Sequence, residues 1–262
     1  MPRLWAPVAG PTTVRCSLHL SALLLLLAPR TAAAQVLQTL GRDGAGEPES
    51  GRPHLRPREG LQMAFSAGLR FPMGDATHAP GDSLAARYSY QLPLTLDIGA
   101  KVTKNIYAGG YLGWSWGAEG NANSVEEYCD DDDSNLSNDI SCSTHAYRVG
   151  LEAQYHLSPE AEYNPWFGYG FGLETVNQSL RDAPRGFRQS TQSTALTLAR
   201  LNLGVDYRSR SGVGMGLFSE ASAGRFFHTR TEVDGNATYA GGVDDAAFHL
   251  WVGAGLRLVL FP

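Results

Sequence analysis

Beyond residue 35 the sequence has no long hydrophobic run. A membrane-spanning helix needs ~20 consecutive apolar residues, and no later stretch of the 262-residue chain approaches that length. The chain is 43% hydrophobic and only 18% charged, with 30 glycines. This composition fits one large all-β domain or two small domains. If the protein lies in a membrane, helices do not hold it there.

The sequence also has no excess of basic residues. It contains 21 Lys and Arg against 26 Asp and Glu, a formal net charge of −5. A nucleic-acid-binding protein would be expected to carry a basic patch. The balance therefore argues against nucleic acid as a partner.

Motifs for metals, cofactors and catalysis are missing as well. The histidines at 145, 156, 228 and 249 lie on separate segments without the spacing of metal ligands. The glycines of "GYGFG" (168–172) repeat with the period of a strand, and no helix start follows them, as a nucleotide-binding loop would require. We expect no metal, no cofactor, no catalytic residue and no enzymatic activity.

One apolar run does occur, and it is short. It extends from Leu20 to Ala28, follows Arg15 and precedes three alanines that end at Ala34. This order is typical of a secretory signal peptide, which we assign to residues 1–34. The polar segment 35–60, rich in Gly, Pro and charge, is predicted to be a disordered periplasmic linker.

Alternation of apolar and polar residues dominates the rest of the chain. In "LTLDIGAKV" (94–102) Leu94, Leu96 and Ile98 alternate with Thr95, Asp97 and Gly99. Because successive side chains of a strand point to opposite faces, this period predicts a strand. The pattern occurs eight times, at 61–71, 90–102, 106–117, 146–157, 165–176, 194–208, 213–226 and 247–261.

The connections between these segments are alternately long and short. An up-and-down arrangement places four long connections at one end and three tight turns at the other. Transmembrane β-barrels have this asymmetry and an even number of strands. We predict an all-β fold, an eight-stranded antiparallel up-and-down transmembrane barrel over 61–262, with four long external loops and three short periplasmic turns.

The composition of the polar faces indicates whether they face solvent outside the barrel or line its lumen. A soluble lipocalin-like carrier would turn its apolar face inward, whereas a membrane barrel turns it to lipid. The polar faces carry five bases and five acids, separated by glycines, as a narrow lumen of paired charges requires. This predicted lumen network comprises Arg70, Asp97, Lys101, Arg148, Glu152, Glu174, Arg200, Asp206, Glu220 and Arg257.

Aromatic residues cluster towards both ends of the predicted strands, as in the interfacial girdles of membrane proteins. The predicted girdle at the short-turn end contains Tyr155, Trp166, Tyr207 and Phe261. The predicted girdle at the long-loop end contains Phe71, Trp114, Trp116 and Tyr147.

Residues 61 to 262 as a whole resemble the small eight-stranded outer-membrane β-barrel proteins of the OmpA/OmpX-like type. Within that group, "YHLSPEAEYNPWFGYGFGLE" and "WVGAGLRLVLFP" resemble segments of barrels from myxobacteria-like Gram-negatives. The final strand "GAGLRLVLF" is similar to the C-terminal signal recognised by the barrel assembly machinery. The family signal ends on the aromatic residue, whereas Pro262 follows Phe261 in this chain.

Two features of the loop at 126–142 remain to be placed. Cys129 and Cys142 form an even pair in an exported chain, which predicts a disulfide. The acidic run Asp130–Asp133 could bind a divalent cation through oxygen ligands. The EF-hand pattern fails, however, and a solvated acidic loop is the simpler interpretation.

The sequence thus predicts an outer-membrane protein, exported by its signal peptide and monomeric. Its lumen is filled by paired charges, so it is structural, surface-interacting or a very narrow pore. Its expected partners are outer-membrane lipid and lipopolysaccharide, with the barrel assembly machinery during biogenesis. The alternatives are a soluble lipocalin-like binding protein and a lipid A-modifying barrel enzyme.

Overall fold

A computed structural model describes residues 59–78, 82–120, 140–182, 186–209 and 212–261. Almost all of the segment assigned to the signal peptide and linker lies outside these ranges, as do Cys129 and the acidic run Asp130–Asp133. The disulfide between Cys129 and Cys142 and the possible cation site therefore stay predictions.

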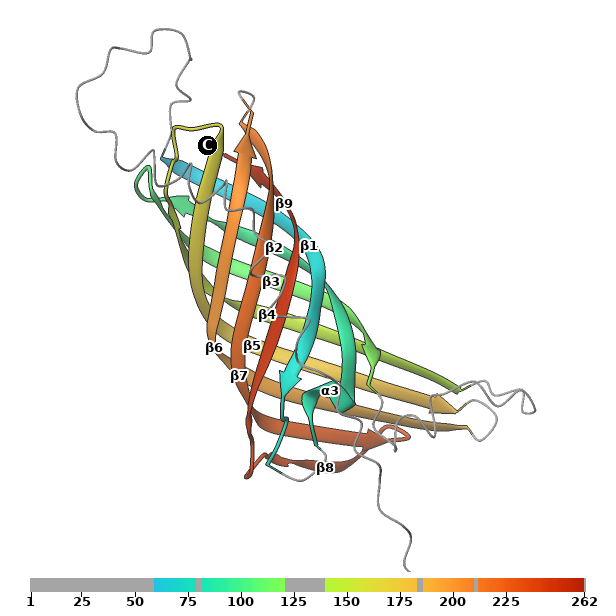
Figure 1. Ribbon diagram of the computed structural model, residues 1–262. Coiled ribbons are helices and arrows are strands. Elements are labelled where there is room, and N and C mark those ends of the chain that lie inside the picture. The colour runs from blue at the N-terminus through green and yellow to red at the C-terminus, as the bar shows by residue number, and fades with distance from the viewer. Residues whose placement is uncertain (1–58, 79–81, 121–139, 183–185, 210–211, 262) are drawn as a thin grey trace, which may run out of the picture. The chain divides into compact units, whose positions relative to one another are not determined.

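The described residues form strands and one short helix (Figure 1). The elements are β1 (Gly60–Gly74), α3 (Leu84–Arg87), β2 (Tyr88–Lys101), β3 (Ile106–Glu119), β4 (Ile140–His156), β5 (Tyr163–Asp182), β6 (Phe187–Arg208), β7 (Val213–Val233), β8 (Asn236–Gly242) and β9 (Phe248–Leu260). No helix among the described residues is long and apolar enough to cross a membrane.

Eight of these strands close into a ring. Each strand from β1 to β6 pairs with the next in an antiparallel sense, and β9 pairs with both β7 and β1. The remaining strand, β8, pairs with the far part of β7 and folds back as a hairpin outside the ring. The predicted eight-stranded up-and-down barrel is confirmed, and its eighth strand is β9.

Strands β5, β6 and β7 run well past their predicted ends. β5 and β6 stay paired as far as Asp182 and Phe187, so the predicted long connection 177–193 is largely a hairpin. Apart from Leu180 and Phe187, its paired residues are polar on both faces, which removes the alternation from the sequence. The backbone hydrogen bonds of the ladder do not depend on that alternation, and the β-branched Thr191 favours the extended conformation. Figure 1 shows the far parts of β5 and β6 projecting from the barrel together with that of β4, which stays paired with β5 as far as Ile140 and Asp182.

A small apolar cluster fills the barrel at the long-loop end. α3 begins after Ser83, whose side chain accepts a 3.1 Å hydrogen bond from the Ala86 amide, and it presents the fully buried Leu84. Residues of several strands and of the β1–β2 connection pack with Leu84, and we call this set the apolar seal. It comprises Ala76, Leu84, Tyr88, Ala146, Val176, Ala195, Phe226 and Trp251.

Candidate functional site: the ion-paired interior

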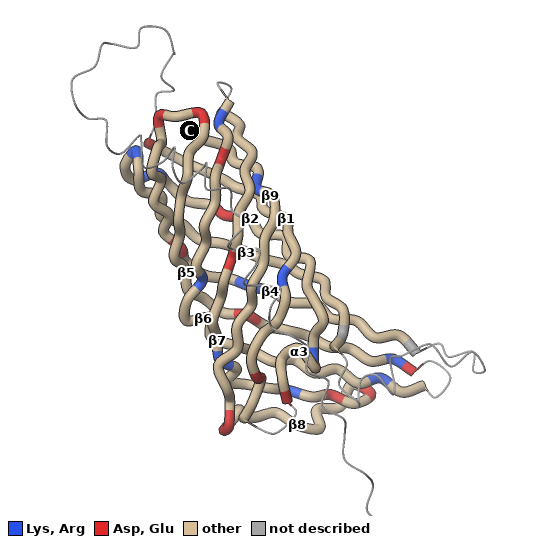
Figure 2. The backbone as a smooth tube through the Cα atoms, viewed as in Figure 1, with Lys and Arg blue, Asp and Glu red and all other residues tan. Residues whose placement is uncertain are grey.

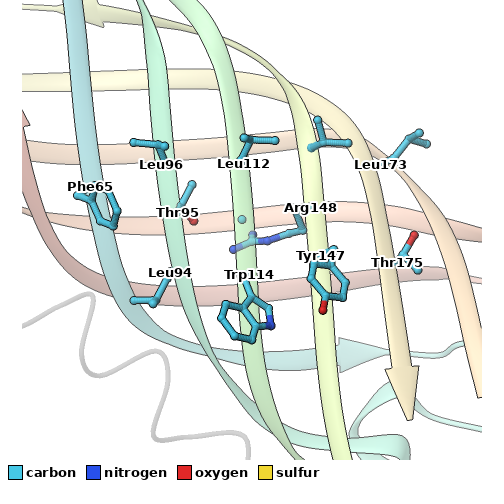
Figure 3. Close-up of a pocket in the computed structure, with 12 residues that line it drawn as sticks. Phe65, Leu94, Thr95, Leu96, Leu112, Trp114, Tyr147, Arg148, Leu173 and Thr175 are labelled. Carbon is cyan, nitrogen blue, oxygen red and sulfur yellow. The ribbon is translucent and has the colours of Figure 1, made fainter. Parts of the chain in front are cut away.

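The outer wall of the barrel is apolar. Leu151 and Leu203 are 58% and 62% exposed, whereas Asp97 is 4% exposed. Figure 3 shows a groove of this wall, where Phe65, Leu112 and Trp114 come from two of the strands that line it. This pattern of exposed leucines and buried aspartates is the inverse of the pattern found in soluble proteins. The chain is an eight-stranded transmembrane-type barrel.

All ten charged residues predicted for the lumen lie inside this barrel, at exposed fractions of 7% or less. Figure 2 shows acidic and basic positions distributed along its length. Burial of so many ions is tolerable only if they are paired and hydrogen-bonded. Their contacts form three groups along the barrel.

The group nearest the apolar seal is built around Arg70. Its guanidinium contacts the Glu174 carboxylate, and its Nε donates a 2.8 Å hydrogen bond to Gln91. The same guanidinium lies 4.3 Å from the centre of the Trp251 ring. Trp251 belongs to the apolar seal, so this arginine joins the seal to the ionic interior.

The central group is built around Glu220, which lies between two arginines. One carboxylate oxygen accepts from Arg148 at 2.7 Å and the other from Arg200 at 2.8 Å. Arg200 also contacts Glu152 at 3.0 Å and Asp97 at 3.9 Å. A chain of alternating charge therefore crosses the lumen and joins four strands.

The group nearest the short turns is less completely paired. Arg257 donates to Gln154 at 2.9 Å and lies 3.6 Å from Asp206. Gln154 donates in turn to Glu152 at 2.6 Å, which connects this group to the central one. Among the described residues, the Lys101 ammonium has no hydrogen-bond partner and lies 5.9 Å from the Phe261 ring.

Aromatic rings stack on the lumen arginines, which was not predicted. Arg200 lies 4.4 Å from the Tyr111 ring and Arg257 lies 4.2 Å from the Trp166 ring. Cation–π contacts of this kind gain strength where water is excluded. The sequence offered one signal for these contacts, which is that Tyr111 lies among glycines on a polar face. A tyrosine at such an inward-facing position does not belong to the lipid-facing wall.

The predicted girdle at the short-turn end was wrong for two of its members. Trp166 and Phe261 are 4% and 8% exposed and lie inside the barrel. Tyr155 and Tyr207, at 41% and 43%, are on the outer wall as predicted. Aromatic residues of the girdle and of the lumen lie at the same height along the barrel. They differ only in the face of the strand that carries them. All four members predicted at the long-loop end are exposed, at Phe71, Trp114, Trp116 and Tyr147.

Glycines on the inner face give these rings room. A Cβ on Gly150 would lie 2.2 Å from the Phe171 carbonyl oxygen and 2.6 Å from the Tyr111 ring. We expect Gly150→Ala to lower the free energy of unfolding by about 1–3 kcal/mol, since overpacking forces the ring and backbone to shift. Urea titration of tryptophan fluorescence in lipid vesicles measures this.

The matched control is Gly110→Ala on β3, where the nearest atom to the added Cβ is 3.3 Å away. We expect a clearly smaller loss for this variant. Equal losses for the two variants would contradict a special requirement for space beside Tyr111.

The described residues contain no group of three or more His, Cys, Asp or Glu side chains that could hold a metal ion. Cys142 lies on β4, and the histidines at 145, 156, 228 and 249 lie on three strands. His156 is fully buried, and its ring contacts the Asn164 amide at 2.7 Å.

Comparison with known proteins gives distant structural likenesses. No family model matches the chain, and no curated protein matches it. Ail, the attachment invasion locus protein of Yersinia pestis, is 11% identical, with 77% of this chain and 99% of that chain covered and a TM-score of 0.40. A major outer membrane protein from Thermus thermophilus is 13% identical, with 75% and 99% covered and a TM-score of 0.42.

A third likeness is to the outer membrane protein OprG from Pseudomonas aeruginosa, at 11% identity, with 77% and 97% covered and a TM-score of 0.37. At such identities and TM-scores these likenesses carry no argument about this chain, so its function has to be argued from the side chains of the barrel.

Proposed function

We propose that the protein is an integral outer-membrane barrel whose lumen is closed, and which acts as a rigid anchor for its external hairpins. The observation that carries this proposal is the inversion of the wall, with exposed leucines outside and ten buried charges inside. Such a surface is stable only in lipid. The outer membrane of a Gram-negative cell is the membrane in which barrels of this kind occur.

Two kinds of closure support the absence of an open channel. The charged side chains cross the lumen as ion pairs, and an eight-stranded barrel has an interior just wide enough for side chains to fill. Beyond them the apolar seal adds a layer that includes the fully buried Leu84 and Val176. An ion entering from the long-loop end would meet the apolar layer before reaching any charge of the lumen network.

Membrane insertion is tested by refolding the protein into lipid vesicles and comparing unboiled with boiled samples by gel electrophoresis. We expect the unboiled protein to be membrane-bound and to migrate differently from the boiled form, because a closed barrel resists detergent. A soluble protein that binds an apolar dye in its interior would instead support the lipocalin-like alternative.

Closure is tested by conductance of the refolded protein in planar bilayers. We expect no steady current of open-porin size, with an open porin in the same bilayer as the positive control. A steady current of that size from the wild-type protein would contradict the closed lumen.

We also propose that the barrel has no enzymatic activity on lipid. Overproduction in a Gram-negative host is expected to leave the mass spectrum of lipid A unchanged. A mass change that accompanies overproduction would favour the lipid A-modifying enzyme.

A further inference from the structure

The outer faces of β5 and β6 change character along their length. Leu173 and Leu196 are opposite each other on β5 and β6 and are 43% and 42% exposed. The next outward-facing pair towards the long-loop end is Thr175 and Thr194. Beyond this pair, the described side chains on the outer face of these two strands are all polar. The change marks where the apolar band ends towards the long-loop end.

Arg225 lies at this boundary. It is paired with Leu196 on one side and with Phe248 on the other, and directly opposite residues share a face of the sheet. Its side chain is exposed, and no ion pair is found for it among the described residues. An arginine at the edge of an apolar wall can extend its charged group to the membrane surface while its stem lies on apolar side chains.

A second cationic group lies farther out on the same face, next to Asp234, whose carboxylate accepts a 2.8 Å hydrogen bond from the Arg188 backbone amide. Arg181 and Arg188 are exposed and directly opposite each other on β5 and β6, although like charges in that position repel. At ~3.4 Å per residue they lie about 27 Å along β6 from the position of Arg225. Arg230, between the two groups, contacts Glu232 at 2.5 Å and is already neutralised.

Side chains between these two groups are suited to hydroxyl-rich ligands. The outward positions carry Thr175, Thr194, Asn177 and Gln192 in cross-strand pairs. Along β5 and β6 the outer face is therefore apolar, then hydroxyl and amide, and then cationic at Arg181 and Arg188. Strand β7 adds Arg225 at the edge of the band, the exposed Phe227 just beyond it, and Glu232 opposite Ser190.

We propose that this face of β5–β7 binds a phosphorylated glycolipid of the outer leaflet. Its acyl chains lie on the leucine wall, Arg225 binds the phosphate nearest the chains, and Arg181 with Arg188 binds anionic groups farther out on the saccharide. Arginine suits phosphate because its planar fork donates two parallel hydrogen bonds. The proposal rests on the outer-membrane location and adds a binding site to it.

A membrane lipid fits better than a soluble polyanion because the cation at Arg225 is continuous with the apolar wall. A soluble polyanion would have no part that matches Leu196 and Phe248. A phosphorylated glycolipid combines apolar, anionic and hydroxyl groups, and this face of the barrel presents counterparts to all three.

The test measures binding to the refolded full-length barrel in detergent by native mass spectrometry. The probes are phosphorylated lipid A, enzymatically dephosphorylated lipid A and a core-bearing lipopolysaccharide. We expect Arg225→Gln to weaken binding of lipid A and of the core-bearing form by roughly tenfold, the loss of one charge-assisted contact. Arg181→Gln with Arg188→Gln should weaken only the core-bearing form.

Lys104→Gln is the matched control, because Lys104 is an exposed cation at the opposite end of the barrel. It should leave all three affinities unchanged. Equal binding of phosphorylated and dephosphorylated lipid A, or equal losses for Lys104→Gln and Arg225→Gln, would overturn the proposal. Binding of inorganic phosphate or a soluble sulfated polysaccharide in preference to lipid A would also overturn it. Gel mobility of each variant separates these results from a failure of the barrel to insert.

Discussion

Replacement of Glu220 by glutamine is expected to lower the free energy of unfolding by about 3–5 kcal/mol, the usual cost of removing one partner from a buried ion pair. Glu220 accepts from Arg148 at 2.7 Å and from Arg200 at 2.8 Å, and it is 7% exposed. The amide keeps the shape of the side chain but removes its charge. Two buried guanidinium groups then face each other without the anion between them.

The measurement is urea unfolding of the refolded protein in lipid vesicles, followed by tryptophan fluorescence. Glu160→Gln is the control, because Glu160 pairs with Lys104 at 3.2 Å and is half exposed. Exposed pairs contribute about 0–1 kcal/mol, so this variant should lie close to the wild type.

A double variant shows whether the loss comes from the unpaired cation. Arg148 is in an ion pair with Glu220, so Arg148→Met with Glu220→Gln removes one cation and one anion together. We expect the double variant to lose less than the sum of the two single variants, since neighbours in one network are not additive. Additive losses, or a loss below about 1 kcal/mol for Glu220→Gln, would mean that the central group contributes little to stability.

Replacement of Leu201 by arginine is expected to destabilise the membrane-inserted barrel by about 2–4 kcal/mol, because its position on β6 lies in the middle of the apolar band. Leu201 is 53% exposed on the outer wall, between Leu196 and Tyr207 along the strand. The charge would be surrounded by acyl chains, and the arginine could reach the interface only by bending away from the wall. Urea unfolding in lipid vesicles measures the loss.

Ser190→Arg is the matched control. Ser190 lies on the outward face of the same strand but beyond Leu196, where the cross-strand partners are Ser179 and Glu232. Arginine at this position should change stability by less than about 1 kcal/mol, as for a solvated surface charge. If Leu201→Arg were as harmless as Ser190→Arg, the leucine wall would not be in contact with lipid.

The two faces of each strand could be read from the sequence because the signal is local. Successive side chains alternate in direction, so "LTLDIGAKV" alone separates Leu94 and Ile98 from Asp97. The same argument applied strand by strand places all ten charges on the inner side. It stops where both faces are mostly polar, as in the β5–β6 hairpin beyond Val176, and there the strands proved longer than predicted.

The sequence did not predict the aromatic part of the interior. Trp166 near the short turns looks like a girdle residue from its depth alone, but its ring stacks on Arg257. The apolar seal was missed for a similar reason. Leu84 lies in a connection without periodicity, and nothing in its neighbours indicates that the chain folds into the mouth of the barrel.

By itself the sequence determined the strand number, the inverted faces and the set of buried charges, because all three follow from a two-residue period and the charge of each residue. Only the tertiary structure decided which charges meet. Arg148 and Glu220 are 72 residues apart and on different strands, and the closure of the sheet brings them to 2.7 Å. The stagger between strands sets which side chains face each other across a lumen, and that stagger arises from the pairing of all eight strands rather than from any one segment.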